Sequence, residues 1–196
     1  MIPASWALLG ALIGSAGGVV YLVDTVRGRA RPNRVTWLLW GLFPLVIFAA
    51  QRAQGVAELS WTTASAGLLP LLVLAASCAN PRAYWKSAPR DVLLLGAALA
   101  GMALWAVTDQ PNLALLFALA ADILASLPTL HKAWREPRSE SWPAYAVSAL
   151  GFCISLLAVP EPTLEAAAFV AYIFLLNATL ALLAARRPAA RPSEAP

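Results

Sequence analysis

The chain has 196 residues, of which 60% are hydrophobic and 12% are charged, and its net charge is +4. A water-soluble domain of this length needs more polar surface than such a composition supplies, so the sequence predicts an all-α integral membrane protein. The positive charges stand at the ends of apolar runs, where anionic lipid headgroups attract them, and this placement argues against nucleic-acid binding.

Apolar runs follow one another along almost the whole chain. Each approaches the roughly 20 residues that a helix needs to cross hydrocarbon. We therefore expect seven spanning helices, over residues 2–26, 34–53, 59–79, 91–107, 113–134, 142–159 and 164–185. The connections between them are too short for an extramembrane domain. Residues 187–196, rich in Pro and Ala, are expected to form a disordered cytoplasmic tail.

The basic residues alternate with these runs. Of the 14 Lys and Arg residues, all except Arg52 lie at the end of the first, third, fifth or seventh run or in the segment that follows it. Because short cationic loops stay in the cytoplasm, we expect the N-terminus outside and the C-terminus inside. The abundance of Ala, Arg and Pro suggests a GC-rich bacterial source, so the expected location is a bacterial inner membrane. The four clusters are Arg27, Arg29, Arg31 and Arg34; Arg82, Lys86 and Arg90; Lys132, Arg135 and Arg138; and Arg186, Arg187 and Arg191.

A weak internal repeat relates the two ends of the chain. An offset of 105 residues places Pro32 on Pro137 and Trp37 on Trp142. Two three-helix copies can share one orientation only if an extra helix separates them, which predicts a 3+1+3 arrangement of two parallel three-helix bundles. The alternative is a chance alignment of two apolar helices with basic ends. The expected units are residues 1–80, the first repeat; 81–110, the linker helix with its loops; and 111–186, the second repeat.

An acidic residue, Asp122, lies about halfway along the fifth predicted helix. An ionised carboxylate at the centre of a bilayer costs several kcal/mol, so Asp122 should face the bundle interior, be protonated or bind a cation. Ser126 follows it on the same helical face. Proton coupling is one hypothesis. The alternative is a carboxylic acid held in purely structural hydrogen bonds.

Three further residues inside the runs are candidates for binding a ligand or bending a helix. Asn177 offers two donors and one acceptor to a polar ligand, although amides also join helices to one another. Pro44 and Pro128 bend their helices, either as hinges or as static kinks. The first helix carries a series of glycines that is most simply a packing seam: Gly10, Gly14, Gly17 and Gly18.

The sequence gives no sign of cofactor chemistry. Cys78 and Cys153 stand alone in different runs, which indicates neither a disulfide nor a metal site. No paired nucleophile and base and no Walker-type glycine loop occurs, so we expect neither an enzyme nor an ATP-driven pump.

Two loop segments carry a resemblance to a known family. The Leu-Pro-Thr of residues 127–129, then Lys132, then the Pro-Arg-Ser-Glu-Ser of residues 137–141 resemble the motif of the PQ-loop superfamily. In that motif a Pro-Gln pair precedes a basic residue and a Ser-rich turn, and here Thr129 stands in place of the Gln. The first copy keeps residues 31–37, which look similar to a group of uncharacterised bacterial seven-helix membrane proteins. The motif residues are Pro32, Asn33, Trp37, Pro137 and Ser141.

The superfamily includes the SWEET sugar transporters and the lysosomal amino-acid exporters. The resemblance implies alternating access, with hinges at Pro44 and Pro128, to a small polar solute held near Asp122, Ser126 and Asn177. Protons are the candidate coupling ion, and the lipid bilayer and further copies of the chain are the other expected partners. The alternative function is a non-transporting membrane protein that serves as an assembly or interaction partner.

Overall fold

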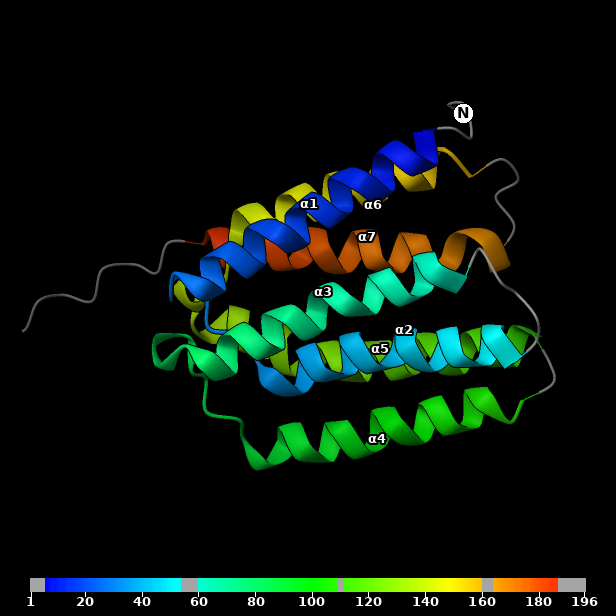
Figure 1. The fold of residues 1–196 in the computed structure, drawn as a ribbon, viewed down its shortest axis with the longest axis horizontal. Coiled ribbons are helices and arrows are strands. Elements are labelled where there is room, and N and C mark those ends of the chain that lie inside the picture. The colour runs from blue at the N-terminus through cyan, green and yellow to red at the C-terminus, as the bar shows by residue number, and fades with distance from the viewer. Residues whose placement is uncertain (1–5, 54–59, 109–110, 160–163, 187–196) are drawn as a thin grey trace, which may run out of the picture.

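The protein is helical throughout the part that its computed structural model describes, residues 6–53, 60–108, 111–159 and 164–186 (Figure 1). No strand occurs in these ranges, which confirms the all-α class. The described helix ends fall within two residues of the predicted ones, whereas the predicted start of the first helix and the predicted tail lie outside the described residues. The elements are α1 (Trp6–Val26), α2 (Arg34–Ala53), α3 (Ser60–Ala79), η1 (Pro81–Ala83), α4 (Pro89–Ala106), α5 (Pro111–Arg135), η2 (Pro137–Ser139), α6 (Trp142–Leu157) and α7 (Leu164–Ala185).

Local polar contacts fix where the helices begin and end. α1 ends at Val26, and two residues later Gly28 has a φ of 71°, which lets the next two backbone amides donate to the carbonyl oxygen of Asp24. The side-chain amide of Asn80 donates to the carbonyl oxygen of Val26 at 2.8 Å. At the start of α2, Oδ1 of Asn33 accepts the backbone amide two residues further on, at 3.0 Å. These caps hold the loops at one end of the bundle in a defined path.

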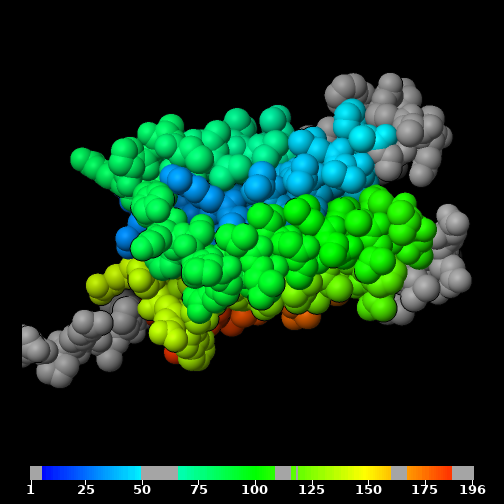
Figure 2. All heavy atoms as spheres, turned by 90° about the horizontal axis from the view of Figure 1, so that it is seen from below, coloured from blue at the N-terminus to red at the C-terminus, as the bar shows by residue number. Residues whose placement is uncertain are grey.

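Six of the seven helices contact one another in a cyclic order, α1, α3, α2, α5, α7, α6 and back to α1. The seventh, α4, lies outside this ring against α5 and α2, and Figure 2 shows it on the surface of the molecule. Successive helices run in opposite directions, so α1 begins at one end of the bundle and α7 finishes at the other (Figure 1). The ends of α1, α3, α5 and α7 therefore share one end, which we call the basic end. It gathers Arg27, Arg29, Arg31, Arg34, Arg82, Lys86, Arg90, Lys132, Arg135, Arg138 and Arg186.

The distribution of side chains is the reverse of that in a water-soluble protein. Large aliphatic side chains point outward, with Leu93 75% exposed and Leu182 72% exposed. Polar groups occupy the interior, with Asn33 1% exposed and Thr129 fully buried. Water would penalise such a surface, whereas lipid tails accept leucine as readily as another helix does, and small or polar residues then mediate helix contacts.

Three described segments are long and apolar enough to cross a membrane by length and composition, namely α1, α4 and the Ala167–Ala185 part of α7. Three shorter apolar segments lie in α2, α3 and α6. In α5 the apolar character is interrupted by buried polar side chains, which belong to the candidate site below.

α1 and α6 approach each other closely along small residues. A Cβ atom built on Gly10 would lie 2.6 Å from the carbonyl oxygen of Gly151, and one on Gly17 would lie 2.6 Å from that of Ala144. No larger side chain fits at these positions without moving the helices apart. The predicted packing seam of the first helix is therefore confirmed at Gly10, Gly14 and Gly17, which face α6, whereas Gly18 faces Leu69 of α3.

Candidate functional site

A stripe of polar side chains runs along the buried face of α5. Its members recur every three or four residues, so they point the same way from the helix. All are at most 8% exposed, and the stripe leads from the middle of the helix to the basic end: Asp122, Ser126, Thr129 and Lys132. The predicted placement of Asp122 and Ser126 on one inward face is thus found. The burial of Lys132 was not expected, because its charge suggested a place among lipid headgroups.

Asp122 and Thr129 are the members of the stripe that carry a buried oxygen atom without a hydrogen-bond partner. In Asp122 this atom is the carboxyl oxygen Oδ2. The Tyr172 side chain of α7 interacts with the same carboxyl group, and the Tyr172 hydroxyl lies 3.5 Å from Oγ of Ser126. Ser126 and Tyr172 also line a cavity of about 180 Å³ between α5 and α7. A buried carboxyl oxygen without a donor can take a proton, a cation or the hydroxyl of a solute.

Asn177 takes a different place from the one expected of a ligand-binding residue. Its Nδ2 donates to the carbonyl oxygen of Ile173 at 2.9 Å, within its own helix. Asn177 does not line the cavity beside Ser126, whereas Tyr172 and Thr179 of the same helix do. The structure therefore brings Tyr172 to Asp122 and Ser126, although the sequence favoured Asn177. Tyr172 lies five residues before Asn177 on α7, and its hydroxyl group is the sequence feature that could have indicated this contact.

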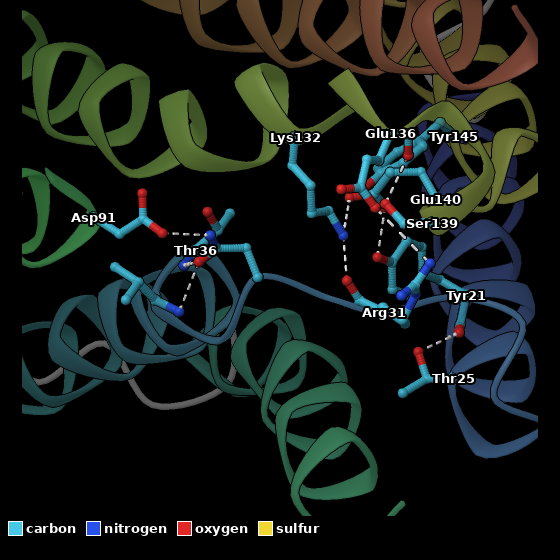
Figure 3. Close-up of polar contacts among 12 residues, drawn as sticks. Tyr21, Thr25, Arg31, Thr36, Asp91, Lys132, Glu136, Ser139, Glu140 and Tyr145 are labelled. Atoms are coloured by element: carbon cyan, nitrogen blue, oxygen red, sulfur yellow. Dashed lines mark hydrogen bonds and ion pairs between the residues drawn. The ribbon is translucent and has the colours of Figure 1, made fainter. Parts of the chain in front are cut away.

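At the basic end of the stripe, Lys132 contacts three loops, and Figure 3 shows its contacts with Arg31 and Glu140. Its Nζ pairs with Oε1 of Glu140 at 2.7 Å, in the loop between α5 and α6. The same ammonium donates to the carbonyl oxygen of Arg31, between α1 and α2. It also lies 5.0 Å from the ring centre of Trp85, between α3 and α4. One buried cation thus contacts every loop that the structure describes at the basic end.

Two tyrosines complete the partners of Glu140. The Tyr21 hydroxyl donates to Oε2 at 2.6 Å, and the Tyr145 hydroxyl donates to the same atom at 3.0 Å. Two charges removed from water are stable only when such additional donors and acceptors surround them. We call Lys132, Glu140, Tyr21 and Tyr145, with the Arg31 carbonyl, the Lys132 cluster.

Further hydrogen bonds join the α1–α2 segment to the α5–α6 loop around the cluster. The backbone amide of Arg31 donates to the carbonyl oxygen of Ser139 at 2.8 Å. Oγ of Ser141 donates to Oδ2 of Asp24 at 2.6 Å. Arg31 and Glu136 form an exposed ion pair at 3.9 Å. The two loops that carry the family resemblance therefore meet directly.

The predicted motif residues surround this junction. Pro32 and Pro137 are buried in it, and the ring of Trp37 packs on that of Tyr21 with centroids 4.4 Å apart. Nε1 of Trp37 is buried without a hydrogen-bond partner. The motif residues thus pack at the contact between the α1–α2 and α5–α6 loops. Tyr21 and Glu140, which were not among the predicted site residues, provide the polar core of this contact.

A second polar contact links α2 to α4 and α5. Nδ2 of Asn33 donates to Oδ2 of Asp91 at 3.0 Å, and Asp91 is 3% exposed. One turn later on α2, Oγ1 of Thr36 donates to the carbonyl oxygen of Ala125 at 2.8 Å. Asn33 therefore caps α2 and anchors α4 at the same time.

The chemistry available at these residues is binding and conformational locking. Among the described side chains, no group of three His, Cys, Asp or Glu residues is arranged to hold a metal ion. Comparisons with family models, with curated proteins and with solved structures found no match to this chain.

Proposed function

We propose that this protein crosses a bacterial inner membrane seven times and transports a small polar solute by alternating access. The outward aliphatic surface and the concentration of cations at one end support the membrane placement. In this orientation the basic end faces the cytoplasm and α1 begins outside.

The cyclic order of helix contacts supports a 3+1+3 arrangement. Exchanging α1, α2 and α3 for α5, α6 and α7 converts every contact of the ring into another observed contact: α1–α3 into α5–α7, α2–α3 into α6–α7, and α1–α6 into α5–α2. Two related three-helix units around a pseudo-twofold axis have this property, and α4 is the extra helix that gives them a common orientation. This arrangement and the loop motif together support membership of the PQ-loop superfamily.

Asp122 carries the proposal for the substrate site. A carboxyl group halfway along a spanning helix, with one buried oxygen lacking a donor, costs free energy. A residue that carries this cost is by default a candidate for function. Ser126 and Tyr172 add hydroxyl groups beside it. These three residues suit the hydroxyl or ammonium groups of a sugar or amino acid, and a proton on Asp122 provides a coupling ion.

The Lys132 cluster acts as the cytoplasmic gate in this proposal. It joins the loops of both three-helix units, so the basic end opens only when Lys132 and Glu140 separate from the α1–α2 loop. Pro44 in α2 and Pro128 in α5 lie within helices that contact each other across the two units. Bending at these prolines moves one unit against the other.

The test is uptake into proteoliposomes of purified protein, with radiolabelled glucose, sucrose and neutral amino acids as the solutes. We expect time-dependent uptake of at least one solute. Asp122→Asn should reduce it by about tenfold or more, the cost of one hydrogen bond to a charged group. Glu136→Gln, which removes an exposed carboxylate, is the matched control. A panel that is not transported, or uptake that Asp122→Asn leaves unchanged, contradicts the proposal.

One observation favours a second function, that of a non-transporting assembly or interaction partner. The Asn177 side-chain amide donates a hydrogen bond to a carbonyl oxygen of its own helix, as expected if the polar groups of the interior only stabilise the fold. This function predicts no uptake by wild-type protein and a stable complex with a membrane partner.

A further inference from the structure

A cleft opens between α4 and α5 near the basic end, next to the cavity beside Ser126, with which it shares Leu130. Its volume is about 280 Å³, and its apolar walls are Leu94 of α4 with Leu127, Pro128 and Leu130 of α5. Leu127 is 38% exposed, so the apolar wall continues onto the outer surface of the bundle. An aliphatic chain lying against α5 can therefore enter the cleft from the lipid side.

Cationic and hydrogen-bonding groups gather at the mouth of this cleft. Arg90 and His131 line it directly. Arg135 follows His131 by one turn on the same face of α5 and, like Arg90, lies within electrostatic range of the imidazole. Both arginines are exposed, so they remain available to an anion.

The carboxylate in the cleft is already engaged. Oδ2 of Asp91 accepts hydrogen bonds from Nδ2 of Asn33 and from the backbone amide of Ala88, each at 3.0 Å. Its Oδ1 lies 3.8 Å from Nε of Arg90. Asp91 thus holds the guanidinium at the mouth of the cleft and leaves the remaining guanidinium nitrogens to a ligand.

Aromatic side chains place the mouth of the cleft at headgroup depth. Tyr84 and Trp134 at the basic end are 52% and 59% exposed. Arginines lie over both rings, Arg34 over Tyr84 at 5.0 Å and Arg186 over Trp134 at 4.1 Å. Exposed Trp and Tyr beside Arg mark the boundary between hydrocarbon and water.

We propose that this cleft binds an anionic phospholipid, with its phosphate held by Arg90, His131 and Arg135 and an acyl chain against Leu94 and Leu127. A basic mouth over an apolar wall matches both parts of such a molecule, and basic pockets between helices on the cytoplasmic side favour anionic headgroups. The cleft shares Leu130 with the cavity beside Ser126 and is otherwise lined by different residues. Because Pro128 forms part of its wall, a bound lipid contacts α5 where that helix bends.

The experiment measures lipid retention by native mass spectrometry of the purified chain, with phosphatidylglycerol and phosphatidylcholine of identical acyl chains. We expect a bound phosphatidylglycerol at lipid concentrations where phosphatidylcholine is lost. The double variant Arg90→Gln with Arg135→Gln should weaken phosphatidylglycerol retention by about fivefold for each cation, which corresponds to about 1 kcal/mol. Equal retention of the two lipids by wild type overturns the proposal.

The matched control is Arg82→Gln with Arg138→Gln, which removes the same charge from exposed positions at the same end but outside the cleft. An equal loss in both double variants means general surface attraction and overturns the site. Displacement of the lipid by inorganic phosphate at the same molar concentration shows that free phosphate is the ligand and also overturns it. Leu94→Trp fills the cleft at unchanged charge and should lower phosphatidylglycerol retention, which tests the site even if the arginine variant fails to fold.

Discussion

Lys132 and Glu140 form an ion pair in which the side chains are only 1% and 0% exposed. Removing two charges from water costs several kcal/mol each, and their mutual attraction repays this only with additional hydrogen bonds. The Tyr21 and Tyr145 hydroxyls and the Arg31 carbonyl supply those bonds. An apolar pair of similar volume would avoid the desolvation cost of the two charges altogether. The main effect of the ion pair is therefore to specify which loops meet, and its contribution to stability is smaller.

Breaking this pair from one side should be strongly destabilising. In Glu140→Gln the buried Lys132 ammonium loses its counter-charge, and such a change costs about 3–5 kcal/mol. Thermal unfolding of the purified variant in detergent measures the loss. Glu136→Gln is the control, because its ion pair with Arg31 is exposed and worth at most about 1 kcal/mol.

Replacing both residues distinguishes the two roles of the ion pair, holding the loops together and stabilising the fold. Lys132→Met with Glu140→Leu removes both charges, so it should be markedly more stable than Glu140→Gln. If Glu140→Gln and Glu136→Gln unfold at the same temperature, the buried pair does not hold the basic end closed.

Asp122 leads to a prediction on the pH dependence of uptake. If a proton on the carboxyl group accompanies the solute, a lower external pH fills that site more often and raises the rate. Asp122→Asn is neutral at every pH, so its residual uptake should not vary with pH. Initial rates in proteoliposomes at two external pH values measure this. A variant that keeps the full pH dependence of the wild type assigns the proton to another group.

Among the helices, α1 and α6 have the closest approach described by their glycines. The contact depends on missing side chains: a Cβ on Gly151 would lie 2.5 Å from the carbonyl oxygen of Gly10 and 2.7 Å from Cα of Gly14. Backbone atoms cannot move aside to make room for a Cβ atom, as the end of a flexible side chain can. Dispersion between closely packed backbones replaces the hydrophobic effect as the source of association in lipid.

Gly151→Ala should therefore destabilise the bundle by about 1–3 kcal/mol, the range for overpacking. Gly96→Ala in α4 is the matched control, because a Cβ there has no neighbour within 4 Å. That change should be neutral or stabilise by up to about 1 kcal/mol, since alanine is the better helix former. Thermal unfolding compares the two, and equal effects would show that the α1–α6 seam is not tightly packed in solution.

The helix ends could be predicted because their causes are local. Hydrocarbon thickness sets the length of each apolar run, and residues such as Pro89, Gly28 and Asn33 interrupt or cap it within a few positions. The partner of each helix could not be predicted. The glycine stripe of α1 indicates that some helix packs there, but the complementary small residues of α6 lie more than a hundred residues away.

The same limit applies to the candidate site. Helical periodicity placed Asp122 and Ser126 on one buried face. It did not place Glu140 beside Tyr21, because 119 residues separate them and only the folded loops bring them together. The burial of Lys132 was missed for a similar reason: the long side chain was expected to reach lipid headgroups, whereas a carboxylate from the next loop meets it inside.

The whole molecule combines an apolar outer surface, a polar interior and a charged end. These features require one another in a bilayer, because lipid accepts the leucines, the helices sequester the polar groups, and the headgroups attract the cations. The loops after α1, α3 and α5 all reach the basic end (Figure 1). In the proposed membrane topology they lie on one side of the bilayer, whichever side that is.

Cysteine labelling tests that arrangement and its orientation together. In a background with Cys78→Ser and Cys153→Ser, we introduce Lys86→Cys or Arg138→Cys at the basic end, or Ala57→Cys between α2 and α3. A membrane-impermeant maleimide added to intact cells should label Ala57→Cys alone, and permeabilised cells should label all three variants, because short cationic loops stay inside. Labelling of Lys86→Cys and Arg138→Cys from opposite sides would contradict the parallel placement of α3 and α5. Labelling of both in intact cells would preserve the fold and invert the membrane orientation, and the proposed gate at Lys132 would then open to the outside.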